Sequence, residues 1–184
     1  ARRSVPSYGL MSRAVMEAVL KKIYGELKAG DEVAFSFQGG EPTLAGLAFF
    51  QSFVEAANRE NPGIHPHYSI QTNGILLDED WCRFLLENHF LVGLSLDGNG
   101  GLHDKNRTDP SGRGTWKRVM AAKRLLEKEG VPYNVLWVLT EETARHPEQV
   151  WRFLREQKIG FVQFIPCLGE LEEPEEPRKP EGSE

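Results

Sequence analysis

Two kinds of apolar run alternate along this chain, and the alternation limits the folds that it can adopt. Five short runs rich in Val, Ile, Leu and Phe indicate strands, and longer runs with apolar residues every three or four positions indicate helices. Strands that alternate with helices pair in parallel through right-handed crossovers. The sequence therefore predicts an α/β protein with a parallel sheet or barrel covered by helices. The expected strands are residues 32–40, 67–74, 90–98, 132–140 and 160–168.

The expected helices precede, separate and follow these strands. They cover residues 12–28, 46–60, 78–89, 115–130 and 146–158. Ser12 is an N-cap candidate for the first helix, and Gly130 is a C-cap candidate for the fourth. Helical spacing in the first helix puts one apolar set on a single face, which we expect to be the buried one. That set is Val15, Val19, Leu20, Ile23 and Leu27.

Each expected strand has one apolar face and one small, polar face. Parallel strands covered on both sides are apolar on both faces, so this pattern is unusual. Small polar groups would be left unsatisfied in a dry core, whereas they can line a cavity for a polar ligand at the carboxyl ends of the strands. The alternative is an open sheet whose polar face meets a hydrogen-bonded helical layer or water. The polar faces carry Ser36, Gln38, Ser69, Gln71, Gly93, Ser95, Asn134 and Gln163.

The first strand ends in the sequence Gln38-Gly39-Gly40-Glu41-Pro42. Two glycines allow a ligand to approach the main chain closely. Carbonyls beyond the last ladder bond can accept from an ammonium group, and a carboxylate beside them adds the opposite charge. A phosphate would instead need amide donors. The stretch favours a site for an α-amino group over a plain strand-to-helix turn, which would need no glutamate.

The charge pattern separates a neutral body from an acidic end. Residues 169–184 hold seven Glu, two basic residues and three Pro, which leaves 20 acidic and 20 basic residues before them. We expect one domain over residues 1–168, then a linker or disordered tail, with an acidic interaction motif as the alternative. A neutral body predicts no nucleic-acid partner. Without a long apolar stretch or a signal peptide, we expect a cytoplasmic protein with no membrane partner.

Cysteine and histidine are sparse. Cys82 and Cys167 are the only cysteines, too few for a disulfide framework, and we expect a packed thiol and a small residue filling the barrel interior, respectively. Cys167 contacting a ligand is the alternative. His65 and His67 have no evident third metal ligand, so no metal site is predicted. His103 lies in a glycine-rich loop, where an ordering hydrogen bond is favoured over a role as a base.

Several longer runs, taken in order, resemble a known family. Gly-Gly-Glu-Pro after a strand resembles the hallmark of radical S-adenosylmethionine (radical SAM) enzymes. The runs "SFQGGEPTLAGLAFF", "SIQTNGILLDEDWCRFL", "FLVGLSLDG", "HDKNR" and "FVQFIPCL" are similar to anaerobic sulfatase-maturating enzymes, from about "SYGLM" to Leu168. The resemblance implies a partial (β/α)6 TIM-like barrel of the radical SAM type, with five of its six strands visible in this chain.

The resemblance also implies an oxidoreductase activity. In that family a [4Fe–4S] cluster reductively cleaves S-adenosylmethionine, and the 5′-deoxyadenosyl radical abstracts hydrogen from Cβ of a Cys or Ser in a sulfatase. The product is Cα-formylglycine. The implied partners are a peptide or unfolded sulfatase as substrate and an electron donor such as flavodoxin or ferredoxin.

Particular residues take roles by this resemblance. Each of these roles fits the chemistry of its residue, since a guanidinium suits a carboxylate. Without the resemblance, Arg107 would be a solvated surface charge, and the Ser95 hydroxyl would satisfy a neighbouring backbone group. The implied roles are Gly39, Gly40 and Glu41 for the methionyl ammonium, Ser95 for the methionyl or ribose part, Arg107 for the methionyl carboxylate, the Leu168 backbone for adenine, and Gln38 for the substrate peptide.

The chain departs from the family at both ends. The family's C-x-x-x-C-x-x-C cluster motif and its cysteine-rich C-terminal extension do not occur here, so the cluster ligands would lie outside this chain. We therefore expect the chain to be inactive alone. Two alternatives remain: another peptide-modifying radical enzyme of the same barrel, forming thioethers or crosslinks, and a degenerate cluster-free barrel that only binds peptide or nucleoside. The loop at residues 97–115 is expected to be mobile when empty or ordered by ligand through Arg107.

Overall fold

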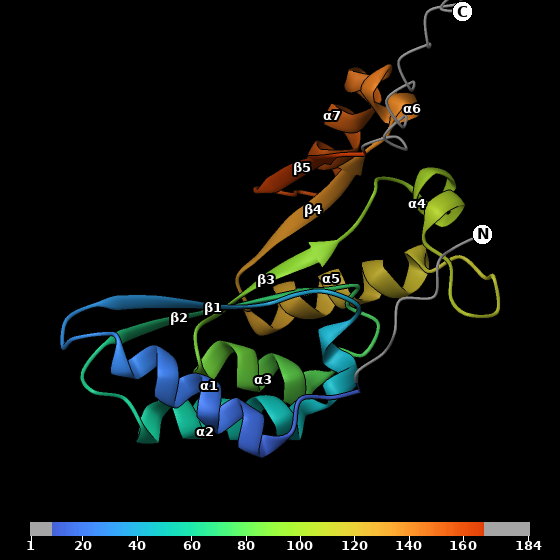
Figure 1. Cartoon of the computed structure of the whole chain (residues 1–184). Coiled ribbons are helices and arrows are strands. Elements are labelled where there is room, and N and C mark those ends of the chain that lie inside the picture. Colours follow the sequence, from blue (N-terminus) through green and yellow to red (C-terminus); the bar gives the residue numbers. More distant parts are fainter. Residues whose placement is uncertain (1–8, 168–184) are drawn as a thin grey trace, which may run out of the picture.

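The computed structural model of the chain describes residues 9–167, in which five parallel strands form one curled sheet (Figure 1). The strands lie side by side in the order in which they occur along the chain. Successive right-handed crossovers that turn the same way produce this order, which is that of a barrel. The predicted partial barrel is therefore confirmed. The strands are β1 (Glu32–Phe37), β2 (His65–Thr72), β3 (Phe90–Ser95), β4 (Tyr133–Leu139) and β5 (Val162–Pro166).

All five expected helices are present. They are α1 (Arg13–Gly25), α2 (Leu47–Arg59), α3 (Glu79–Glu87), α5 (Trp116–Glu129) and α7 (Pro147–Glu156). The predicted caps are confirmed: Ser12 Oγ accepts from Val15 N at 3.3 Å, and Gly130 closes α5 with a φ of 72°. Three short helices that we did not predict are η1 (Pro42–Ala45), α4 (Gly100–Asn106) and α6 (Glu141–Ala144). No helix within residues 9–167 has the length and apolar content needed to cross a bilayer.

An aromatic ladder across three strands anchors the core. The register pairs Phe35 of β1 with Tyr68 of β2, and Tyr68 with Phe90 of β3. Their rings stack at centroid distances of 5.8 Å and 5.0 Å. Helix α2 covers the ladder, and the ring of its Phe53 meets Phe35 edge-on at 5.2 Å. Aromatic pairs in these geometries contribute beyond their buried area, so the ladder fixes the register of β1, β2 and β3.

Helix α1 buries only part of the predicted face: Leu20 is buried and Ile23 and Leu27 pack against the core, as expected, but Val15 and Val19 do not. Its buried residues are Met16, Leu20 and Tyr24, spaced four apart, whereas Val15 and Val19 are 51% and 40% exposed. The described residues provide no cover for Val15 and Val19, because β1 pairs only with β2 and its other edge is free. Val19 instead lines a hollow of about 470 Å³ along that free edge. The prediction was correct for Leu20, Ile23 and Leu27, and wrong for Val15 and Val19, whose places in the core are taken by Met16 and Tyr24.

The polar face of the sheet is uncovered in the part of the chain that the structure describes. Helices α1, α2 and α3 lie on the opposite side of β1 and β2 (Figure 1). Gln38, Gln71 and Gln163 are exposed on the polar side, and no helical layer meets them. The expected polar face is thus present and accessible. Some apolar residues share this face: Leu91, paired with Ser69, is exposed, whereas Leu136 is buried beside Gly93, where a Cβ would come within 2.9 Å of Leu136 Cδ1.

Candidate functional site

The turn after β1 presents bare main chain to open space. Gly39 and Gly40 have φ values of +88° and +56°, a region that other residues enter at a cost of about 1–2 kcal/mol. Within residues 9–167, no heavy atom other than those of the glycine and its two chain neighbours lies within 4 Å of the place where a Cβ would be added to either residue. The turn thus requires glycine for its conformation, and its surroundings leave room for a ligand to approach the backbone, as the sequence predicted.

The Glu41 carboxylate joins the ends of β1 and β2. Its Oε1 atom accepts from Thr43 N at 3.1 Å, Thr43 Oγ1 at 2.6 Å and Thr72 Oγ1 at 2.7 Å. Its Oε2 atom accepts from Asn73 N at 2.8 Å. Oε1 is saturated by three donors, whereas Oε2 keeps acceptor capacity. Glu41 therefore fixes the glycine turn against β2 and also brings a negative charge to it.

Arg107 is held by the carboxylate of Asp97, a residue with no predicted role. Arg107 Nε and Nη2 donate to the two oxygens of Asp97 at 2.5 Å and 3.3 Å. The Asp97 side chain is 9% exposed and that of Arg107 is 26% exposed. The pair is thus partly buried and bidentate, and Arg107 is not the solvated surface charge considered as the alternative. Both residues lie beyond the carboxyl end of β3.

A buried histidine holds the backbone of Arg107. Asp97 N donates to His103 Nδ1 at 3.2 Å, so the proton of the neutral ring lies on Nε2. Nε2 is 3.0 Å from Thr115 Oγ1, which in turn donates to the Arg107 carbonyl at 2.9 Å. Burial lowers the pKa of His103, and the positive charge of Arg107 lowers it further. The predicted ordering hydrogen bond of His103 is therefore confirmed.

The loop at residues 97–115 is ordered by contacts within it and with Trp116, which the sequence pattern did not predict. Helix α4 lies within it, beyond the ends of β3 and β4 (Figure 1). Asp104 Oδ1 accepts from Trp116 N at 2.8 Å, and Trp116 Nε1 donates to the Gly98 carbonyl at 2.9 Å. A Cβ on Gly114 would overlap the Asp104 carboxylate. Ordering through these contacts needs no ligand.

Two further predicted residues have accessible polar groups. Ser95 ends β3, and its hydroxyl makes no hydrogen bond to any residue in the range 9–167, so it does not satisfy a neighbouring backbone group there. Gln38 is exposed beside Gly39 and lines the hollow at the free edge of β1. Leu168 and the acidic segment at 169–184 lie outside the described residues.

The cysteines and the remaining histidines form no metal centre. Cys82 is fully buried, and burial raises the pKa of its thiol to about 11, as expected of a packed thiol. Cys167 is exposed and does not fill an interior. His65 and His67 are exposed at the start of β2. Among residues 9–167, no group of three His, Cys, Asp or Glu could hold a metal ion.

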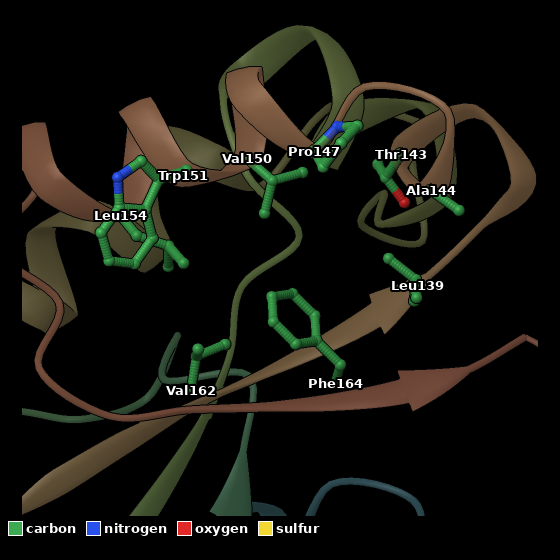
Figure 2. Close-up of a pocket in the computed structure, with 9 residues that line it drawn as sticks. All are labelled: Leu139, Thr143, Ala144, Pro147, Val150, Trp151, Leu154, Val162 and Phe164. Atoms are coloured by element: carbon green, nitrogen blue, oxygen red, sulfur yellow. The ribbon is translucent and has the colours of Figure 1, made fainter.

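The most apolar pocket lies on the other face of the sheet. It has a volume of about 490 Å³ and lies between α7 and the strands β4 and β5 (Figure 2). Val150 and Trp151 of α7 face Phe164 of β5 across it (Figure 2). Its lining is almost wholly aliphatic and aromatic, which does not suit a zwitterionic ligand. The candidate site is therefore the set of strand ends at Gly39, Glu41, Ser95 and Arg107.

Residues 5–154 match the model of the radical SAM superfamily, so the chain belongs to this superfamily. It is 40% identical over 175 residues to a cysteine-type anaerobic sulfatase-maturating enzyme of Clostridium novyi, and 45% identical over 172 residues to one of Clostridium perfringens. It is 36% identical over 162 residues to a serine-type enzyme of Klebsiella aerogenes. These matches cover 95%, 93% and 87% of this chain.

Solved structures agree with these relatives. One described as native anSMEcpe with bound AdoMet and Kp18Cys peptide superposes with a TM-score of 0.87 at 45% identity, over 92% of this chain and 47% of that one. SuiB of Streptococcus suis bound to S-adenosylmethionine superposes with a TM-score of 0.54 at 18% identity, a likeness of fold alone. The resemblance predicted from the sequence is confirmed. The chain spans about half the length of the curated relatives, between 40% and 46% for the three named.

The two cofactors of the family fit this chain differently. S-adenosylmethionine fits the strand ends, because open main chain at Gly39 and Gly40 lies at one strand end and the Arg107 guanidinium lies beyond another. A [4Fe–4S] cluster does not fit, because it requires several cysteine thiolates. The chain has two cysteines, of which Cys82 is buried within α3.

Proposed function

We propose that this chain is the S-adenosylmethionine-binding core of a radical SAM enzyme that oxidises a Cys or Ser residue of a sulfatase to Cα-formylglycine. The observation that carries the proposal is the pairing of two features at the strand ends. One is the open glycine turn beside the Glu41 carboxylate, and the other is the guanidinium of Arg107. Together they complement the ammonium and the carboxylate of one amino-acid group.

In this proposal, different residues bind different parts of S-adenosylmethionine. Carbonyls of Gly39 and Gly40 accept from the methionyl ammonium, and Glu41 adds negative charge next to it. Arg107 pairs with the methionyl carboxylate, and the free hydroxyl of Ser95 bonds the methionyl or ribose part. The backbone of Leu168 reads the adenine edge. When bound, S-adenosylmethionine supplies the group that removes hydrogen from Cβ of the substrate.

The substrate occupies the uncovered polar face. Gln38 borders the glycine turn and is exposed, so its amide is available to the main chain of an extended peptide. A peptide or unfolded sulfatase is the substrate class. The relatives of both the cysteine and the serine type support this class, and the higher identity to the cysteine type, 40% and 45% against 36%, favours a Cys substrate.

The chain alone does not carry out the reaction. The [4Fe–4S] cluster needs ligands beyond those of this chain, since its two cysteines cannot hold the cluster. The electron donor in this proposal is a flavodoxin or ferredoxin. We expect no 5′-deoxyadenosine from the 184-residue chain after iron–sulfur reconstitution. Its formation would contradict this part of the proposal.

The test uses the natural protein that contains this chain, with its clusters reconstituted and a chemical reductant present. It is incubated with S-adenosylmethionine and a peptide carrying Cys-x-Pro-x-Arg, or its Ser counterpart. We expect a mass loss that matches conversion of the thiol to an aldehyde, and a hydrazine adduct of the product. A thioether or crosslinked product would contradict the proposal and indicate the alternative, another peptide-modifying radical enzyme of the same barrel. A natural protein that holds no cluster would replace it with a binding-only barrel.

A further inference from the structure

We propose that Asp97 is a positioning residue, which aims the Arg107 guanidinium at the carboxylate of the bound methionyl group. The inference rests on the proposed function, because it assigns a ligand carboxylate to Arg107. Asp97 itself does not touch the ligand in this proposal. It acts through the bidentate pair with Arg107, whose Nε and Nη2 atoms lie 2.5 Å and 3.3 Å from its oxygens.

The geometry of the pair leaves one edge of the guanidinium available. A guanidinium has a side edge, formed by Nε and one terminal nitrogen, and an end edge, formed by both terminal nitrogens. Asp97 occupies the side edge. Nη1 of Arg107 makes no hydrogen bond to any residue in the range 9–167. The end edge can therefore take a second carboxylate in a bidentate manner while Asp97 stays in place.

Asp97 is itself fixed by the sheet. Its Oδ1 atom accepts from Val138 N at 2.8 Å. Val138 lies on β4 beyond Leu136, the last residue of that strand paired with β3. The Asp97 carboxylate thus spans the point at which β3 and β4 separate. A nearly buried carboxylate with three donors has little freedom to move, so the direction of the guanidinium is set by the barrel rather than by the loop.

Asp97 also holds the backbone of Arg107, through His103 and Thr115. Asp97 N donates to His103, whose ring meets Thr115, and Thr115 holds the Arg107 carbonyl. Arg107 is thereby tied to Asp97 at both its side chain and its main chain. A flexible arginine loses rotamer freedom when it binds, and a guanidinium ordered in advance avoids part of that loss. Asp97 should therefore raise affinity only for ligands that have a carboxylate.

The experiment compares S-adenosylmethionine with its decarboxylated counterpart, which keeps the amine, the sulfonium and the nucleoside. Equilibrium binding is measured with the natural protein that contains this chain. The unaltered protein should prefer S-adenosylmethionine by about tenfold or more. Arg107→Ala should remove the preference, and Asp97→Asn should lower it by about fivefold or more. Asp97→Asn added to Arg107→Ala should cause no further loss of preference.

The matched control is Asp109→Asn. Asp109 pairs with Arg113 at 3.0 Å in the same loop, and we assign it no ligand contact. This variant should keep the full preference. If Asp97→Asn fails to fold, Asp97→Glu keeps the charge but moves it by one methylene, and it should also lower the preference.

The outcomes separate the inference from the proposed function. Equal weakening of both ligands by Asp97→Asn, or an unchanged preference, would mean that Asp97 only stabilises the loop, and the inference would be overturned while the function stands. Binding of neither ligand by the unaltered protein would overturn the proposed function together with the inference.

Discussion

Glu41 and Asn73 connect the ends of two neighbouring strands: Glu41 Oε2 accepts a hydrogen bond from the backbone N–H of Asn73 at 2.8 Å. The other carboxylate oxygen accepts hydrogen bonds from Thr43 and Thr72, so the Glu41 side chain holds the glycine turn against β2. Hydrogen bonds to a charged acceptor are stronger than neutral ones. The acid beside the glycines thus has a structural role in addition to the one proposed for it in ligand binding.

Replacing Glu41 by Gln should destabilise the chain. The amide group keeps one oxygen but turns the other acceptor into a donor, which opposes the N–H of Asn73. We expect the free energy of unfolding to fall by about 1–3 kcal/mol, measured by urea denaturation. Glu55→Gln, on the exposed face of α2, is the matched control and should change it little. Equal stability of the two variants would contradict this role of Glu41.

The stability of the chain should depend on pH through His103. Its folded-state pKa is lowered from 6.5, first by burial and then by Arg107. Above pH 6.5 the ring is neutral in both states, so the shift has no effect there. As the pH falls below 6.5, only the unfolded state takes up the proton, and folding loses up to about 1.4 kcal/mol for each pH unit until the folded pKa is reached.

The variant His103→Gln should lose this component of the pH dependence. Urea denaturation at several pH values below 6.5 gives the slope for each protein. His65→Gln, at an exposed position, is the control and should retain the slope of the unaltered chain. An identical slope in His103→Gln and the unaltered chain would show that His103 is not the buried, neutral group described above.

The two thiols should differ in reactivity. Cys167 is exposed, whereas burial raises the pKa of Cys82 to about 11, so little thiolate forms at neutral pH. A thiol reagent such as DTNB should label one cysteine in the native chain and both in denaturant. Cys167→Ser should abolish the native labelling, and Cys82→Ser should leave it intact. Rapid native labelling of Cys82 would contradict the packing of α3.

The 184-residue chain should self-associate when isolated. Strands β1 and β5 each have one unpaired edge among the described residues, and large apolar side chains lie exposed near both. Val15→Lys combined with Val19→Lys should reduce the association seen by light scattering. Ala121→Lys on α5 is the control and should not. A clean monomer of the unaltered chain at high concentration would count against this expectation.

The order of elements could be predicted because local patterns determine it. Alternating apolar residues indicate each strand. Two successive glycines indicate the turn, because glycine is favoured where φ is positive, as it is at Gly39 and Gly40. The exact edge of the buried stripe of α1 could not be predicted, because Val15 with Val19 and Met16 with Leu20 are both apolar pairs at helical spacing. Only the fold determines which stripe meets the core.

The contacts of Arg107 could not be predicted from the sequence, for a different reason. Gly100 and Gly101 disfavour a helix, so α4 was not predicted. The helix forms because Asn99 caps it, accepting from Leu102 N at 3.1 Å, and because His103 is buried. Helix α4 turns the chain back, so that Arg107 lies next to Asp97. Asp97 lies at the end of an expected strand, ten residues before Arg107. A lone acid in that position was the one sequence feature that could have indicated the pair.

The most direct test of the account is the equilibrium binding of S-adenosylmethionine to the natural protein that contains this chain, compared with Arg107→Ala and Arg113→Ala. Arg113 lies in the same loop but is 78% exposed and pairs with Asp109. We predict tight binding by the unaltered protein, a loss of about tenfold or more in Arg107→Ala, and no loss in Arg113→Ala. Absence of binding by the unaltered protein, or equal affinity in all three proteins, would contradict the assignment of the strand ends as the S-adenosylmethionine site.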